Sequence, residues 1–137
     1  MFEPGERNPI VEFGGNVAAV AVCADVGRSS HPQQAADRGA KTYLASMFVI
    51  PSEFGGEISK LKGYAVQHSM MVAFANFGRP TGGLASAGRS AIWSETGELL
   101  VQLGTNGAGI AVVTETQQGR RARAIHLDEP SGRHPSI

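Results

Sequence analysis

A short, continuous apolar run over residues 17–22 is the feature that most limits the folds open to this chain. It contains only valine and alanine, without the polar alternation of a strand that faces water on one side. Such a run suits a strand that is covered on both faces, as in the parallel sheets of α/β proteins. It ends at Cys23, the only cysteine of the 137 residues, and a polar turn over 27–31 follows. The sequence therefore predicts a buried strand that carries a thiol to the end of a sheet.

Strand and helix patterns alternate along the rest of the chain. Pro32 suits the first turn of a helix, and Gly39 suits the position just after its end. A second strand is predicted over 41–49, and a helix with one apolar face over 57–69. The remaining predicted elements are a strand over 70–74, a glycine-rich loop over 78–88, a hairpin of strands 90–94 and 99–103, a strand over 109–114 and a short helical stretch near 117–125. This order predicts an α/β fold with a mixed sheet, in one domain over residues 1–127, and a disordered tail over 128–137.

Composition and charge exclude several classes of partner. Twelve basic and twelve acidic side chains cancel, so no general field attracts nucleic acid or an anionic membrane. The one basic cluster, at residues 120–123, is interpreted as a solvated helix face or a frayed tail and not as a nucleic-acid site. No apolar run approaches the roughly 20 residues of a membrane span, and no signal peptide is recognisable. With a single cysteine and scattered histidines, the sequence predicts a cytoplasmic protein that binds no nucleic acid, membrane, metal or cofactor.

Cys23 has two interpretations when it is judged by position alone. It is either a small buried side chain or a nucleophile at the end of a strand. In the second case, the backbone N–H of Ala24 is placed to donate to an oxyanion. Asp25 is expected to fix the shape of the turn. A Cys–His dyad with His31 or His68 stays open, as does a redox-sensing role for the thiol, and the loop over 78–88 is expected to form the rim of a pocket.

A series of short motifs resembles a known family in order and spacing. Residues 20–28 are similar to an apolar strand followed by Cys-x-Asp, and residues 35–40 to the helix end that follows it. Residues 73–76 are similar to a strand that ends in Asn, and residues 88–92 to a strand that starts with Gly-x-Ser. Gly97 fits the hairpin after it, and residues 2–5 match a Phe-x-Pro-Gly turn. Together these motifs, over residues 2 to about 127, resemble the carbon–nitrogen hydrolase family of the nitrilase superfamily.

The resemblance implies a four-layer α-β-β-α sandwich and a hydrolase that acts on non-peptide C–N bonds of amides, carbamoyl compounds or nitriles. It implies that Cys23 forms a covalent thioester or thioimidate and that the Ala24 N–H stabilises the tetrahedral intermediate. In the family, a glutamate base, a lysine and a second glutamate assist the cysteine. No cofactor is implied. Family members usually pair through helices near the nucleophile, so a homodimer is expected.

The resemblance also predicts a partial domain. The assisting glutamates and lysine precede the Phe-x-Pro-Gly turn in the family, and here only Met1 precedes it. The chain is therefore expected to be the C-terminal half of the domain, with a missing N-terminal half and impaired turnover. Residues 64–68 read Tyr-Ala-Val-Gln-His where many members have Arg-Ala-x-Glu-Asn. The alternative hypothesis is a catalytically inactive fragment that acts as an oligomerisation or interaction module.

Overall fold

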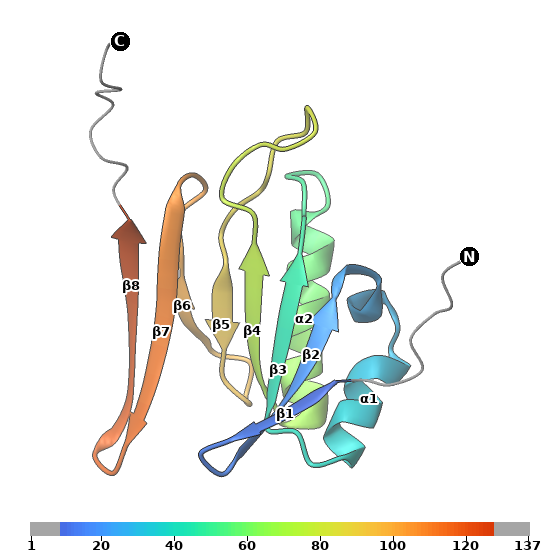
Figure 1. The fold of residues 1–137 in the computed structure, drawn as a ribbon, viewed down its shortest axis with the longest axis vertical. Helices are drawn as coiled ribbons and strands as arrows, with labels where there is room; N and C mark the ends of the chain where they lie inside the picture. The colour runs from blue at the N-terminus through green and yellow to red at the C-terminus, as the bar shows by residue number, and fades with distance from the viewer. Residues whose placement is uncertain (1–8, 128–137) are drawn as a thin grey trace.

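The computed structural model describes residues 9–127, which form eight strands, two α-helices and one 3-10 helix, η1 (Figure 1). In chain order, these elements are β1 (Ile10–Phe13), β2 (Asn16–Val22), η1 (Cys23–Gly27), α1 (Ser30–Asp37), β3 (Thr42–Met47), α2 (Phe54–His68), β4 (Met71–Asn76), β5 (Ala91–Trp93), β6 (Leu99–Gln102), β7 (Ala108–Thr116) and β8 (Gly119–Leu127). The motif at residues 2–5 and the tail over 128–137 lie outside the described residues, and the domain bounds remain a prediction.

Strands β1 to β6 form one mixed sheet in their chain order. The pairs β2–β3 and β3–β4 are parallel, while the other neighbours are antiparallel. Parallel neighbours need a crossover connection, which α1 and α2 supply. The predicted α/β class, the mixed sheet and the β5–β6 hairpin are therefore confirmed. No helix among the described residues is long and apolar enough to cross a bilayer.

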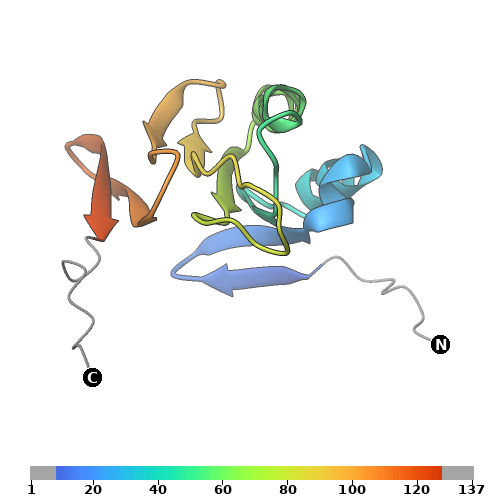
Figure 2. The same ribbon diagram turned by 90° about the horizontal axis from the view of Figure 1, so that it is seen from above.

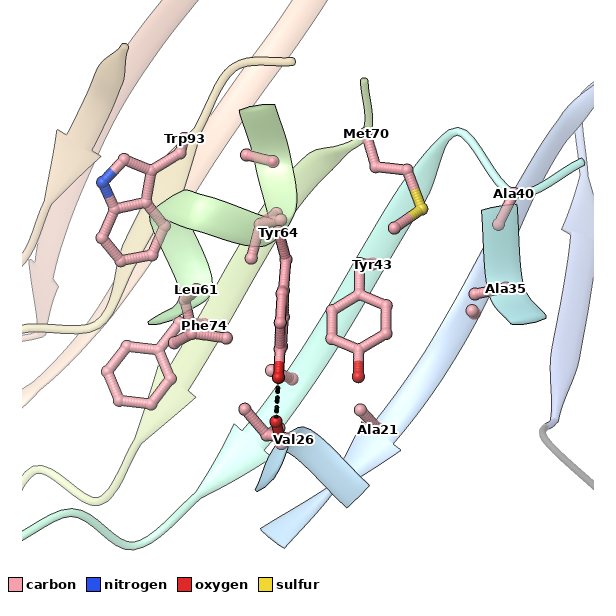
Figure 3. Packing of buried hydrophobic residues seen from close by; sticks show 14 of the residues in the cluster. Ala21, Val26, Ala35, Ala40, Tyr43, Leu61, Tyr64, Met70, Phe74 and Trp93 are labelled. Carbon is pink, nitrogen blue, oxygen red and sulfur yellow. Dashed lines mark hydrogen bonds between the residues drawn. The ribbon is translucent and has the colours of Figure 1, made fainter. Parts of the chain in front are cut away.

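Both helices lie on the same side of the sheet (Figure 2), and the main core fills the space between them and the strands. Two rows of side chains line this face because their residues pair in register from β2 to β5. One row is Ala19, Tyr43, Val72 and Trp93, and the other is Ala21, Ala45, Phe74 and Ala91. Leu61 and Tyr64 of α2 pack against these rows (Figure 3).

The opposite face is also apolar but is only half-buried. Its central row is Val20, Leu44, Ala73 and Ile92, one residue along from the buried rows. Together with Ile110 of β7, this row lines a groove of about 440 Å³. The described chain thus has one helix layer and one six-stranded sheet, and the separate two-stranded sheet of β7 and β8 lies beside the open face.

The predicted helical stretch near 117–125 is wrong. These residues belong to β8, which pairs with β7 in an antiparallel hairpin whose register places Ile110 opposite Ile125. Gly119 has a positive φ, which lets the chain reverse after Thr116. The basic residues that suggested a helix face instead stand on this hairpin. Arg120 there forms ion pairs with Glu115 of β7 and with Glu95 of the β5–β6 turn.

Strand β1 was not expected from the sequence. It pairs with β2 in an antiparallel hairpin, with Phe13 opposite Asn16. Gly14 and Gly15 between them both have positive φ, as a tight two-residue turn requires. The turn chemistry was visible in the sequence, but the short run of residues 10–13 shows no clear alternation.

Candidate active site

Cys23 stands at the carboxyl end of β2, where it begins η1. Its thiol belongs to an exposed residue, so the interpretation as a buried core cysteine is wrong. Its φ is +49°, in the left-handed region that residues with a Cβ rarely adopt. Such backbone strain, of order 1–3 kcal/mol, persists only where the surrounding structure imposes it, and it is concentrated at functional sites.

The turn presents backbone donors beside the thiol. The first N–H groups of a helix have no partner inside that helix, so η1 itself does not use the N–H of Ala24. Ala24 directly follows the candidate nucleophile in this short helix. Backbone N–H groups in such a position can hold an oxyanion. Its role as an oxyanion donor remains a prediction.

Two side chains fix the turn on either side of Cys23. The carboxylate of Asp25 accepts a hydrogen bond of 3.0 Å from the backbone N–H of Val22, just before the cysteine. The hydroxyl of Tyr64 donates a buried hydrogen bond of 2.6 Å to the carbonyl of Val26, three residues after it (Figure 3). Asp25 thus shapes the turn as expected, whereas no sequence pattern indicated a role for Tyr64.

His31 belongs to the support of the turn and not to a dyad. Its Nδ1 is 2.8 Å from the hydroxyl of Tyr43, and its Nε2 is 3.9 Å from the carboxylate of Asp25. Burial lowers the pKa of His31 below 6.5, against the opposing effect of Asp25, so the ring is neutral at pH 7. Burial also raises the pKa of Tyr43, which keeps its hydroxyl protonated.

The structure does not support a Cys–His dyad within the described residues. His68 lies against the ring of Tyr64, with the ring centroids 6.4 Å apart. No hydrogen bond in residues 9–127 joins either histidine to Cys23. In the same part of the chain, no three histidine, cysteine, aspartate or glutamate side chains lie close enough together to hold a metal ion.

Asn76, at the end of β4, organises the loops at the same edge of the sheet. Its side-chain oxygen accepts hydrogen bonds from the N–H groups of Val49 and Phe77, each at 2.9 Å. Its amide nitrogen donates to the carbonyls of Val49 at 3.2 Å and Gly88 at 3.0 Å. One side chain therefore links the loops that follow β3 and β4 to the segment that leads into β5. The sequence marked this residue as a strand-ending Asn but did not reveal its role.

The ends of the neighbouring parallel strands meet beside the cysteine. Val22 pairs with Ser46, and Met47 pairs with Asn76. Residues 46, 47 and 75–77 line a hollow of about 280 Å³ at this edge. The carboxyl ends of parallel strands are where open α/β sheets commonly bind ligands.

The glycine-rich loop is held at both ends by close backbone packing. A Cβ at Gly78 would lie 2.2 Å from the carbonyl oxygen of Gly107, and one at Gly88 would lie 2.3 Å from that of Thr105. These two glycines are therefore needed for space, since the loop lies directly against the β6–β7 connection. The expectation that the loop forms a pocket rim remains a prediction.

Comparisons with known proteins bear on this arrangement. No protein-family model matches the sequence, and no curated protein sequence matches it. An amidase from Nesterenkonia sp. AN1 has a similar structure, with a TM-score of 0.67 and 27% identity over 93% of this chain and 46% of the amidase. A variant of that amidase carries acrylamide, joined by Michael addition at the active-site cysteine, with a TM-score of 0.67 and 27% identity over 93% of this chain and 45% of the amidase. An alanine variant of the amidase is complexed with butyramide, with a TM-score of 0.67 and 26% identity over 92% of this chain and 44% of the amidase.

The amidase is described as a member of the nitrilase superfamily. The chain spans less than half of the amidase's length, while nearly all of the chain is matched. This agrees with the sequence motifs and with a helix layer packed on a six-stranded sheet, beside which the β7–β8 hairpin forms a separate sheet. The chain is therefore similar, in structure and in sequence motifs, to amidases of the nitrilase superfamily over a little less than half of their length.

Proposed function

We propose that this chain takes part in the hydrolysis of a non-peptide C–N bond, with Cys23 as the nucleophile. The substrate class is a small amide, carbamoyl compound or nitrile. The observation that carries the proposal is the exposed thiol, held at a φ of +49° at the carboxyl end of β2. The similar amidase, with its reactive active-site cysteine, supports the same chemistry.

With an amide, the reaction has two stages. The Cys23 sulfur attacks the carbonyl carbon, and the carbonyl π electrons move to the oxygen, which the N–H of Ala24 stabilises. The carbonyl then re-forms as the C–N bond breaks, and the amine leaves with the proton that the thiol gave up, so that a thioester remains on Cys23. Water hydrolyses the thioester, releasing the acid and restoring the thiol.

We propose that the general base and the assisting lysine come from polypeptide outside residues 9–127. The resemblance implies a glutamate base, and Lys60 of α2 is already paired with Glu57 at 3.0 Å. Loss of a general base typically lowers the rate by about 10²- to 10⁴-fold. The described part of the chain is thus expected to supply the nucleophile and oxyanion donor but little turnover by itself.

The open face of the sheet is the proposed contact with that additional polypeptide. Its row of Val20, Leu44, Ala73 and Ile92 has the apolar character of a sheet packed against a second sheet. In a four-layer sandwich, this second sheet would bear its own outer helices. Cys23 lies at the edge of the open face, where residues from both halves would converge.

Covalent probes test the role of Cys23. In the amidase, acrylamide and the acetamide moiety of fluoroacetamide add to the active-site cysteine even when a glutamate is replaced by glutamine. Both probes therefore report on the cysteine without requiring that glutamate. We expect them to modify Cys23 faster in the folded chain than in the same chain unfolded in urea, as measured by intact-protein mass spectrometry.

The chain offers its own controls for this experiment. Cys23 is the only cysteine, so Cys23→Ala should abolish thiol labelling. Fluoride is a poor leaving group, so an ordinary thiol should react very slowly with fluoroacetamide. Equal rates in the folded and unfolded chains would show that the site does not activate Cys23 and would overturn the catalytic assignment.

A second candidate function is a catalytically inactive oligomerisation or interaction module. The half-exposed apolar row on the open face favours it, because two copies could bury these faces against each other. Sedimentation velocity over a range of concentrations should then show a dimer that Leu44→Lys converts to monomer. A wild-type chain that stays monomeric at all concentrations would exclude this self-association.

A further inference from the structure

We infer that Tyr64 is a positioning residue for the nucleophile turn: its hydroxyl holds the Val26 carbonyl and so keeps the oxyanion donor at Ala24 aligned with Cys23. The inference rests on the proposed function and names a residue that the sequence motifs do not assign to the site. In the family pattern, this position of the second helix is commonly arginine, whereas this chain has tyrosine.

The contact links two elements that are far apart in the sequence. Tyr64 lies in the last two turns of α2, 38 residues beyond Val26, and the hydrogen bond of 2.6 Å between them is buried. Val26 is itself fully buried in the core. Its carbonyl therefore has little access to water, and a buried acceptor without a partner is costly. Tyr64 supplies that partner (Figure 3).

The geometry connects this bond to the reactive atoms. Val26 and Ala24 belong to the same single 3-10 helix, five residues long, that begins at Cys23. A turn this short moves nearly as one unit, so the direction of the Val26 carbonyl and that of the Ala24 N–H are coupled. Asp25 fixes the entry to the turn through the N–H of Val22. Tyr64, which lies in α2, fixes the end of the turn through the carbonyl of Val26.

The environment of Tyr64 keeps its hydroxyl a donor. Its ring is buried and makes an edge contact with Tyr43, with the centroids 6.0 Å apart. Burial raises the pKa of Tyr64 above its usual value. The phenol is thus protonated at neutral pH and can donate.

The test compares two reactions of Cys23. With 4-nitrophenyl acetate, the sulfur attacks the carbonyl carbon, an oxyanion forms, and 4-nitrophenolate leaves as a thioester is made. With iodoacetamide, the sulfur displaces iodide from a saturated carbon, and no oxyanion forms. The ratio of acylation rate to alkylation rate therefore reports the oxyanion donor separately from exposure of the thiol. Rates measured on Cys23→Ala are subtracted to remove reaction at amines.

We expect the ratio in the folded wild-type chain to exceed that in urea, and Tyr64→Phe to lower it about tenfold, as small misplacements of catalytic groups do. Ser94→Ala is the control, because it removes another buried hydroxyl, whose hydrogen bonds lie in the β5–β6 turn and not at the nucleophile turn. It should reduce stability while the ratio stays at the wild-type value. If Tyr64→Phe unfolds at the assay temperature, the comparison is made in trimethylamine N-oxide, which favours the folded state.

The possible results distinguish the oxyanion role of the turn from the positioning role of Tyr64. A wild-type ratio equal to that in urea would overturn the oxyanion role of the turn, and with it both the proposed function and this inference. A raised wild-type ratio that Tyr64→Phe leaves unchanged would overturn the positioning role alone. An equal fall in Tyr64→Phe and Ser94→Ala would also overturn it, because general loosening of the structure would then explain the effect.

Discussion

The two faces of the six-stranded sheet are built from the same strands, one residue apart, yet they differ in how fully they are buried. On the helix-covered face, Tyr43 and Val72 are fully buried beneath α1 and α2. On the open face, their sequence neighbours Leu44 and Ala73 are only half-buried in a groove. Both faces are apolar, as the sequence of β2 already indicated.

This difference shows that apolar patterning and actual burial are separate properties. A strand that is apolar on both faces is suited to a sheet covered on both sides. In the described chain, α1 and α2 cover one face of the sheet, whereas β7 covers only part of the other face. Cys23 directly follows the last residue of β2, at the carboxyl end of the strand. Variants on the two faces should therefore differ in how much they lower the free energy of unfolding.

The largest expected effect is the loss of a leucine from the helix-covered face. Leu61→Ala should lower the free energy of unfolding by about 3 kcal/mol, because Leu61 is fully buried and its removal leaves a cavity. Leu44→Ala on the open face is the matched control and should cost about 1 kcal/mol or less, since water already reaches that side chain. Urea denaturation followed by circular dichroism measures both, and equal losses would show that the open face is buried in solution.

A smaller effect is expected at the strained backbone between the two faces. Cys23→Gly should be more stable than Cys23→Ala by about 1 kcal/mol, because glycine adopts a positive φ without steric cost. Urea denaturation of the two variants provides the measurement, and neither has a thiol. A Cys23→Ala protein at least as stable as Cys23→Gly would contradict the left-handed conformation of this residue.

The helix-covered side should also show a pH dependence that the open face lacks. Because burial lowers the pKa of His31 below 6.5, the unfolded chain binds a proton that the folded chain excludes. This contribution to stability is fully present above about pH 6.5 and is lost as pH falls toward the folded-state pKa. His31→Gln should therefore flatten the dependence of the unfolding free energy on pH between about 5 and 7. An unchanged slope would show that His31 titrates alike in both states.

The smallest effect is expected on the hairpin beside the open face. Arg120 joins β8 to the β5–β6 turn through Glu95, and both side chains are partly exposed. Backbone hydrogen bonding and Arg120 lower the pKa of Glu95, but solvent screens such pairs. Arg120→Gln should cost only a few tenths of a kcal/mol in urea denaturation at low salt. A loss above about 1 kcal/mol would mean that the pair is a principal anchor of the hairpin.

Sequence patterns predicted the elements wherever one local signal dominated. The apolar run of β2, the proline and glycine that bracket α1, and the apolar face of α2 each indicated the correct type of element. The prediction failed at β8, where Arg120 and Arg121 suggested a solvated helix. These residues form a strand because pairing with β7 gives hydrogen-bond partners to the backbone N–H and C=O groups of both strands. Strand β1 was missed for the same reason, since its strand character depends on pairing with β2.

In the candidate site, too, residues close together in the sequence were predicted and residues brought in by long-range contacts were not. The motif around Cys23 identified the nucleophile, its neighbour Ala24 and the role of Asp25, all within three consecutive residues of one turn. Tyr64 and Asn76 were not assigned to the site, because their partners, Val26 and Val49, are 38 and 27 residues away in the chain. No local pattern reveals a hydrogen bond between elements that meet only after the sheet has formed.

By itself, the sequence predicted the α/β class, the strand that leads to the cysteine, and the resemblance to the carbon–nitrogen hydrolase family. Those properties depend on local periodicity and on residues adjacent in the chain. Only the tertiary structure decided that the thiol is exposed at a positive φ, that His31 supports the turn and does not activate Cys23, and that one face of the sheet remains half-open. These properties depend on which elements pack together, and packing is set by contacts between residues that are distant in the sequence.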